Sequence, residues 1–174
     1  MKEYSPEWLC HEVLEKARDA VIVADREGRV SFWNEGGERT FGYSRDEALG
    51  WSLDPIIPER LRERHWEGYR KVMATGVTRY GDEVLAVPAL RRDGRRISIE
   101  FTILLLRQDG GDLIGTAAFI RDVTARWEKE RELKKRFTEL EAKLSPPGSS
   151  HLHGAGAGLV DQEASAGGQR LGPA

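Results

Sequence analysis

The sequence predicts an α+β fold in which five antiparallel strands flank a helical segment. Short β-branched or alternating runs lie next to glycine-containing turns, a pattern typical of antiparallel hairpins. Between the second and third of these runs, residues 34–75 carry helix caps and helical spacing instead. A chain of 174 residues, with 39% hydrophobic and 32% charged residues, suits one globular domain with appendages.

The first predicted element is an amphipathic helix within residues 1–18. Ser5 is a good cap, Pro6 suits the first helical position, and Glu7 is an acid in the first turn. Apolar residues recur at helical spacing, namely Trp8, Leu9, Val13, Leu14 and Ala17. We expect this helix to lie against the domain or against a partner.

The first hairpin is predicted from strands at 20–24 and 29–33. The turn between them contains Gly28, at a position where a positive φ costs glycine little. Asn34 follows the second strand and is expected to cap a short helix that runs to Phe41.

Two more helices are predicted before the sheet resumes. Ser44 and Glu47 have the spacing of a capping box. Pro58 is expected to start a long helix over residues 59–75, which Gly76 closes.

Three further strands are predicted at 80–90, 95–107 and 113–121. Glycine-containing turns at 92–94 and 109–112 connect them. The middle strand alternates apolar with polar residues, which is the period of a half-buried strand: Ile97, Ile99, Phe101 and Ile103 against Ser98, Glu100 and Thr102.

The chain is highly charged and helical by prediction over residues 125–144. Four apolar residues there are spaced 4, 3 and 4 apart, as in a short coiled-coil seam: Leu133, Phe137, Leu140 and Leu144. The tail, 145–174, is rich in glycine, alanine and serine and is expected to be disordered.

Composition excludes several function classes. The net charge of −2 argues against a nucleic-acid surface. The single cysteine, Cys10, rules out a disulfide framework or a cysteine metal site within one chain. No apolar stretch approaches the roughly 18 residues that span a bilayer, and the first residues lack the apolar segment of a signal peptide. We therefore expect a cytoplasmic protein with no membrane partner. No nucleophile elbow, phosphate loop or paired-carboxylate site indicates an enzyme.

Taken in order, these motifs resemble a PAS sensory domain over about residues 9–124. The resemblance rests on the hairpin Asp25-Arg26-Glu27-Gly28, the Asn34 cap, Gly42-Tyr43 with Glu47 and Gly50, the Arg92-Asp93-Gly94 hairpin and Asp122-Val123-Thr124. It implies a PAS domain at 19–124 whose five-stranded sheet cups a ligand pocket, with helix 125–144 carrying the signal out. It also implies roles in two-component-like signalling or regulation of transcription. PAS domains bind haem, flavin, small metabolites or nothing.

Haem b is the sharpest cofactor hypothesis. Haem iron takes an axial ligand such as histidine, and His65 is the only histidine within the predicted core. By helical periodicity it shares a face with Leu61, Gly68, Tyr69 and Val72, and Gly68 is expected to leave room for a bulky group. His65 lies eight residues before Met73-Ala74-Thr75-Gly76. The haem-ligating histidine of FixL-type PAS domains has a similar placement. The alternative is a core or rim histidine bonded to a backbone carbonyl.

The distal side of this pocket departs from the FixL-type pattern. Those domains carry a distal arginine on the following strand, where this chain has Leu85. Val84, Val87 and Leu90 are expected to complete an apolar wall that suits carbon monoxide or nitric oxide better than oxygen. Candidate hydrogen-bond donors are Tyr80, Trp51 and Arg79. A photoreactive flavin is not expected, because residues 34–53 contain no cysteine.

The sequence therefore predicts a module that senses a small ligand or cofactor state and signals through its C-terminal helix to a partner or effector. Its candidate pocket residues are His65, Leu85, Trp51, Tyr69 and Ile103, and Trp51 and Trp66 are expected at the pocket mouth. Two alternatives remain open. One is a haem-based gas sensor with His65 as proximal ligand. The other is a cofactor-free dimerisation module. Homodimerisation through the flanking helices is expected.

Overall fold

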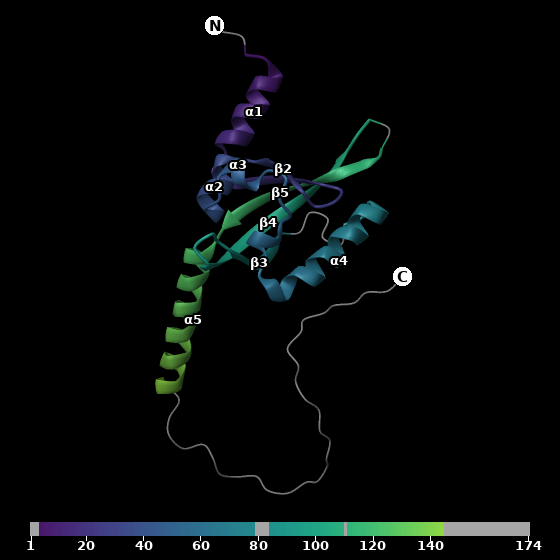
Figure 1. The fold of residues 1–174 in the computed structure, drawn as a ribbon. Helices are drawn as coiled ribbons and strands as arrows, with labels where there is room; N and C mark the ends of the chain where they lie inside the picture. The colour runs from purple at the N-terminus through teal and green to yellow at the C-terminus, as the bar shows by residue number, and fades with distance from the viewer. Residues whose placement is uncertain (1–3, 79–83, 110, 145–174) are drawn as a thin grey trace, which may run out of the picture. The chain divides into compact units, whose positions relative to one another are not determined.

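The computed structural model describes residues 4–78, 84–109 and 111–144 (Figure 1). In chain order the elements are α1 Pro6–Lys16, β1 Ala20–Asp25, β2 Val30–Trp33, α2 Glu35–Phe41, α3 Arg45–Ala48, the 3-10 helix η1 Asp54–Ile56, α4 Glu59–Thr75, β3 Leu85–Leu90, β4 Arg96–Arg107, β5 Leu113–Asp122 and α5 Thr124–Leu144. The chain divides into two compact units, the first ending at Lys135 and the second beginning at Arg136. The described helices include none that is long and apolar enough to cross a membrane.

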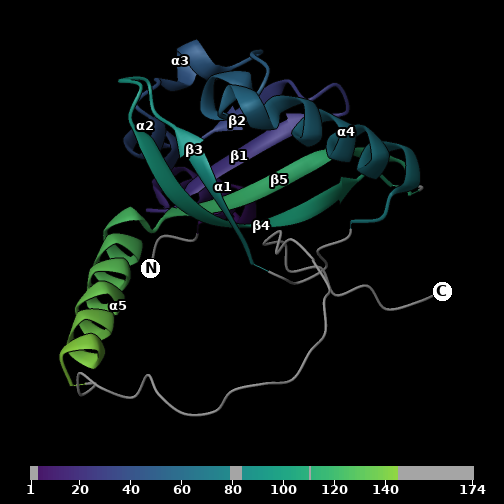
Figure 2. The ribbon, with the colours of Figure 1, turned by 90° about the horizontal axis from the view of Figure 1, so that it is seen from below.

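One five-stranded antiparallel sheet with the order β2-β1-β5-β4-β3 organises the fold. It consists of two hairpins, β1–β2 and β3–β4, that β5 joins by pairing with β1 and with β4. The helices α2, α3 and α4 lie over the same face of this sheet (Figure 2). The predicted α+β class and the five antiparallel strands are confirmed.

The hydrophobic core lies between this face and the helices that cover it. Phe41 of α2 is fully buried, and Trp33 at the end of β2 is 2% exposed. Their rings are 5.5 Å apart. The predicted alternation along β4 is confirmed, since Ile97 and Ile99 belong to the core. Pairing places Ile103 of β4 opposite Ala118 and Phe101 opposite Ile120 of β5, so that the inner face is apolar across both strands.

The predicted helix caps are also confirmed. The Asn34 side chain accepts from the Gly37 amide at the start of α2. Ser44 and Glu47 form the reciprocal capping box of α3. α4 starts after Pro58 and ends at Gly76, whose φ of 64° is left-handed.

Some boundaries differ from the predictions. The helix α1 ends at Lys16, because Ala17 adopts φ −53° and ψ 139°. The third strand begins at Leu85; residues 79–83, which include Tyr80 and Arg79, lie outside the described residues, as does the tail 145–174. β3 is an edge strand and contains Pro88, which edge strands tolerate.

Several apolar side chains are exposed on α1 and on the outer face of the sheet. α1 has no buried residue. On the outer face, Leu104 of β4 and Phe119 of β5 are 55% and 39% exposed. These surfaces stay uncovered by the described part of the chain.

Candidate functional site

Helix α4 presents a half-buried stripe to the rest of the domain, and His65 lies on it. Leu61, Tyr69 and Val72 share this stripe as predicted, whereas Arg60, Glu63, Glu67, Arg70 and Lys71 are exposed. The expectation for Gly68 is wrong. Gly68 is exposed, and a Cβ added there would meet nothing within 4 Å. The buried stripe runs instead through Trp66 and Met73, so Gly68 makes no inward space.

Two aromatic rings lie close to the imidazole of His65. The Trp66 ring lies edge-on to the imidazole at a centroid distance of 4.8 Å, and the Tyr69 ring is 6.0 Å away. Burial lowers the pKa of His65, and the nearby carboxylate of Asp54 opposes this shift. The imidazole is therefore neutral at pH 7. Its Nδ1 atom is buried and has no hydrogen-bond partner among the described residues.

Trp66 anchors α4 at the turn between β1 and β2. Its Nε1 donates to Asp54 Oδ1 at 2.7 Å, and this hydrogen bond lowers the pKa of Asp54. The indole lies over Gly28, where an added Cβ would be 2.2 Å from Trp66 Cζ3. Gly28 also has a φ of 78°. Trp66 was predicted to lie at the mouth of a pocket. In the structure it does not line the small cavity described below, and its contacts with Asp54 and Gly28 anchor α4.

Tyr69 fixes the same helix to the sheet. Its hydroxyl donates to the Asp25 carbonyl at the end of β1 and lies 3.5 Å from Thr116 Oγ1 of β5. Burial raises the pKa of Tyr69. Trp66 and Tyr69, which both follow His65 on α4, are thus held by hydrogen bonds to other parts of the domain.

A small cavity is lined by residues of β2, of α3 and of the segment 51–56, and by none of α4. Its volume is about 10 Å³, and it is lined mainly by Trp33, Tyr43, Trp51, Leu53 and Ile56. This volume is about that of one water site. Of the five predicted pocket residues, only Trp51 lines it. Leu85 and Ile103 are half-buried on β3 and β4, and His65 and Tyr69 lie on α4.

The predicted distal wall is not continuous. Leu85 and Val87 pair with Phe101 and Ile99 of β4 and share the inner face with them. Leu90 pairs with Arg96 and, by strand alternation, projects from the opposite face. Val84 precedes β3 and is 59% exposed. Sequence proximity grouped these residues, but alternation in β3 separates them.

A more open hollow of about 410 Å³ lies where the β3–β4 turn meets α2, lined by Phe41, Gly42, Arg91, Arg92 and Asp93. Arg91 Nη1 donates to the carbonyls of Arg39 and Thr40, and the Arg92 amide donates to that of Phe41. These groups satisfy the last carbonyls of α2. Both arginines are therefore engaged with the fold.

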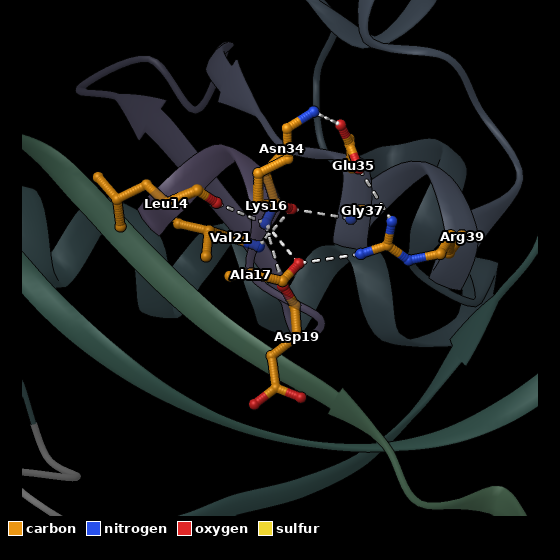
Figure 3. A network of polar contacts seen from close by, with 9 residues as sticks. All are labelled: Leu14, Lys16, Ala17, Asp19, Val21, Asn34, Glu35, Gly37 and Arg39. Atoms are coloured by element: carbon orange, nitrogen blue, oxygen red, sulfur yellow. Dashed lines mark hydrogen bonds and ion pairs between the residues drawn. The ribbon is translucent and has the colours of Figure 1, made fainter. Parts of the chain in front are cut away.

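Asn34 is the centre of a polar network that sequence reasoning identified only in part (Figure 3). Its Oδ1 accepts from the amides of Gly37 and Val21, both at 2.8 Å. Its Nδ2 donates to the carbonyls of Leu14 at 2.9 Å and Asp19 at 3.1 Å. Capping of α2 was readable from local spacing. The contacts to α1 are long-range, and no local pattern encodes them.

Comparison with known proteins gives consistent results. A family model described as PAS fold matches residues 14–128. The sensor protein FixL of Bradyrhizobium diazoefficiens is 30% identical over 128 residues, which cover 74% of this chain and 25% of FixL. The oxygen sensor protein DosP of Escherichia coli is 24% identical over 122 residues, covering 70% of this chain and 15% of DosP. The signal transduction histidine-protein kinase AtoS of Escherichia coli is 30% identical over 123 residues, which cover 70% of this chain and 19% of AtoS. The chain thus spans a quarter or less of the length of these relatives.

Solved structures show the same fold. The PAS domain of a protein from Colwellia psychrerythraea superposes with a TM-score of 0.59 at 21% identity, covering 67% of this chain and 96% of that one. An RNA-binding Light-Oxygen-Voltage receptor superposes with a TM-score of 0.62 at 21% identity, covering 79% of this chain and 41% of that one.

Proposed function

The chain belongs to the PAS family, and from this premise we propose that it senses a small ligand or the state of a cofactor in the cytoplasm. We further propose that the signal leaves through α5 to a partner or effector. Among the relatives, AtoS is a histidine kinase by name. A kinase of that kind, in two-component-like signalling, is the effector that we propose.

The observation that supports this proposal is the attachment of α5 to the central part of the sheet. The Ser98 amide donates to Thr124 Oγ1 at 2.9 Å, and the Val123 amide donates to the Ser98 carbonyl at 2.9 Å. Arg126 forms an ion pair with Glu100. Ser98 and Glu100 flank Ile99, which belongs to the core. A change that shifts Ile99 therefore shifts residues bonded to the first turn of α5.

Haem remains the cofactor that we propose for test. A neutral, half-buried imidazole on α4 and an apolar inner face that includes Leu85 and Ile103 are suitable surroundings. The small cavity beside Trp51 does not fit haem, because pockets for small molecules measure roughly 300–1,000 Å³, whereas this cavity has about 10 Å³ and His65 does not line it. Haem ligation by His65 would therefore need space that this cavity does not provide. Leu85 offers no hydrogen-bond donor, which favours carbon monoxide or nitric oxide over oxygen.

The small cavity favours a second candidate function. A PAS domain whose interior is filled by its own side chains, such as Trp33 and Leu53, suits a cofactor-free module that mediates dimerisation. The two candidates differ in whether the purified protein gains a haem absorption band.

We expect haemin titration to give an absorption band near the violet edge of the visible spectrum, and His65→Ala to weaken or shift it. The reason is the loss of the only core imidazole. Gly68→Ala is the matched control, because it changes an exposed position three residues further along α4. Binding to the wild type with a spectrum unaffected by His65→Ala rules out His65 as ligand. If the wild type binds no haem, the cofactor-free function is preferred.

We also propose a homodimer formed through α1 and α5. On α5, Leu133, Phe137 and Leu140 are 56%, 62% and 56% exposed. The side chain of Leu144, the fourth seam position, lies outside the described residues. A 21-residue helix with these side chains in water gains stability by burying them against a second copy.

The double substitution of Phe137 and Leu140 by aspartate is expected to convert a dimer to a monomer, because it places charge in the seam. Light scattering over a concentration series measures the change. The control is aspartate at Leu104 and Phe119, which puts the same charges on the outer sheet face. A dimer that dissociates only with the control substitutions would move the interface from α5 to the sheet.

A further inference from the structure

Helix α1 has few contacts along its sides, among them an ion pair between Glu15 and Arg45 of α3. It is 11 residues long and contains no buried residue. Isolated helices shorter than about 12–15 residues are marginal in water. Its order therefore depends strongly on its two ends. At the N-terminal end, Ser5 Oγ accepts from the Trp8 amide at 3.2 Å.

At its other end, α1 contacts Asn34 and side chains of α2. The Leu14 carbonyl is among the last four of the helix and has no partner within it; Asn34 Nδ2 donates to it at 2.9 Å. Arg39 Nη2 donates to the Ala17 carbonyl at 3.0 Å. Lys16 forms an ion pair with Glu35 (Figure 3).

Asn34 therefore caps two helices with one side chain. The oxygen caps the N-terminus of α2 and the nitrogen caps the C-terminus of α1. Asn34 is 0% exposed, so neither the oxygen nor the nitrogen of its side-chain amide has water as a substitute partner. A buried amide that loses one set of partners incurs a desolvation penalty. Movement of α2 away from α1 is thus unfavourable unless α1 also changes.

The helix that Asn34 caps packs against one of the residues that line the cavity. Trp33, which lines the cavity, precedes Asn34 directly. A Cβ added at Gly37 would be 2.9 Å from the Trp33 indole, so the ring lies tightly against the first turn of α2. Gly37 is the residue whose amide Asn34 accepts. An unbroken series of contacts therefore leads from the cavity wall through Trp33 and α2 to α1.

We propose that Asn34 makes the helical folding of α1 conditional on the position of α2, so that α1 is a second, N-terminal output of the domain. This inference rests on the proposed sensory function. A displacement of Trp33 shifts the first turn of α2, weakens the Asn34 contacts to the Leu14 and Asp19 carbonyls, and allows α1 to unfold or reorient while the sheet stays folded. This response does not pass through α5.

The test uses Asn34→Asp in the full chain at pH 7. Aspartate keeps an oxygen for the amides of Val21 and Gly37 but replaces the amide donor with an oxygen that faces carbonyls. We expect amide hydrogen exchange in α1 to accelerate roughly tenfold, while exchange in β1 and β5 stays unchanged. Cys10 is the only cysteine in the chain and is exposed on α1. A nitroxide attached there should show faster motion in the variant.

Two further variants keep the test decisive. Arg39→Gln removes the donor to the Ala17 carbonyl from an exposed side chain, and should accelerate exchange in α1 by about two- to threefold without unfolding the domain. Arg92→Gln removes an exposed ion pair to Glu47 and is the control that leaves α1 unchanged. If Asn34→Asp prevents folding, the Arg39→Gln result decides.

The proposal is overturned if α1 exchanges as in the wild type in both variants, or if exchange accelerates equally in α1 and the sheet. Neither result depends on a ligand. Exchange at the first turn of α5, which reports the proposed sensory output, is measured in the same experiment. Loss of the α1 effect therefore leaves that function standing.

Discussion

Replacing Phe41 with alanine is expected to lower the free energy of unfolding by about 3–5 kcal/mol. Phe41 is 0% exposed, and its ring packs 5.5 Å from that of Trp33 within the core. Removal of the ring leaves a cavity that the surrounding strands and helices fill only in part. Because domains of this size are stable by only about 5–15 kcal/mol, the variant should unfold at a much lower urea concentration at 25 °C.

Phe119→Ala is the matched control for this prediction. It deletes the same atoms from the outer face of β5, where Phe119 is 39% exposed, and should cost about 1 kcal/mol. Equal losses in the two variants would contradict the assignment of the core to the inner face. A larger loss at Phe119 would indicate that the outer face is covered in solution.

Gly36→Ala is expected to destabilise the domain by about 2–3 kcal/mol. A Cβ at this position would lie 2.2 Å from the Asp19 carbonyl oxygen and 2.9 Å from that of Ala17. Both atoms belong to the backbone between α1 and β1, so no side-chain rotation relieves the clash. Alanine's better helix propensity, worth up to about 1 kcal/mol, offsets only part of the loss. Thermal unfolding followed by circular dichroism measures the difference.

Gly68→Ala is the same type of substitution, but it is expected to stabilise the domain rather than destabilise it. Gly68 is exposed within α4, and an added Cβ meets nothing within 4 Å. The change should stabilise the domain by about 0.5–1 kcal/mol through helix propensity. A stable Gly36→Ala variant would show that the segment from Ala17 to Asp19 moves away from α2 without difficulty.

Local features were predictable because neighbouring residues determine them. The capping of α2 by Asn34, the capping box of Ser44 and Glu47, and the alternation along β4 each depend on spacings of two to four residues. The predicted start of the third strand, at residue 80, lies outside the described residues, and the described strand begins at Leu85.

The candidate site was predictable only in outline. His65 lies on the predicted helix and is half-buried, but helical periodicity alone placed Gly68 on the buried stripe where Trp66 lies. Orientation of a helix about its own axis is set by the surface that it packs on. Here the hydrogen bond from Trp66 to Asp54, 12 residues away, and the close approach to Gly28 contribute to that orientation. These contacts have no counterpart in a local sequence pattern.

The strand order has a consequence for how the protein is made. β1 is complete at residue 25 and pairs with β2 within a short hairpin, but its second neighbour, β5, begins only at Leu113. While the ribosome synthesises the intervening residues, the second edges of β1 and β4 lack their native partner. Bringing such distant segments together costs conformational entropy, because a long loop must be closed, and this slows folding. A nascent chain that stalls before Asp122 therefore carries two incomplete hairpins with exposed edges, the form most prone to mispairing with other chains.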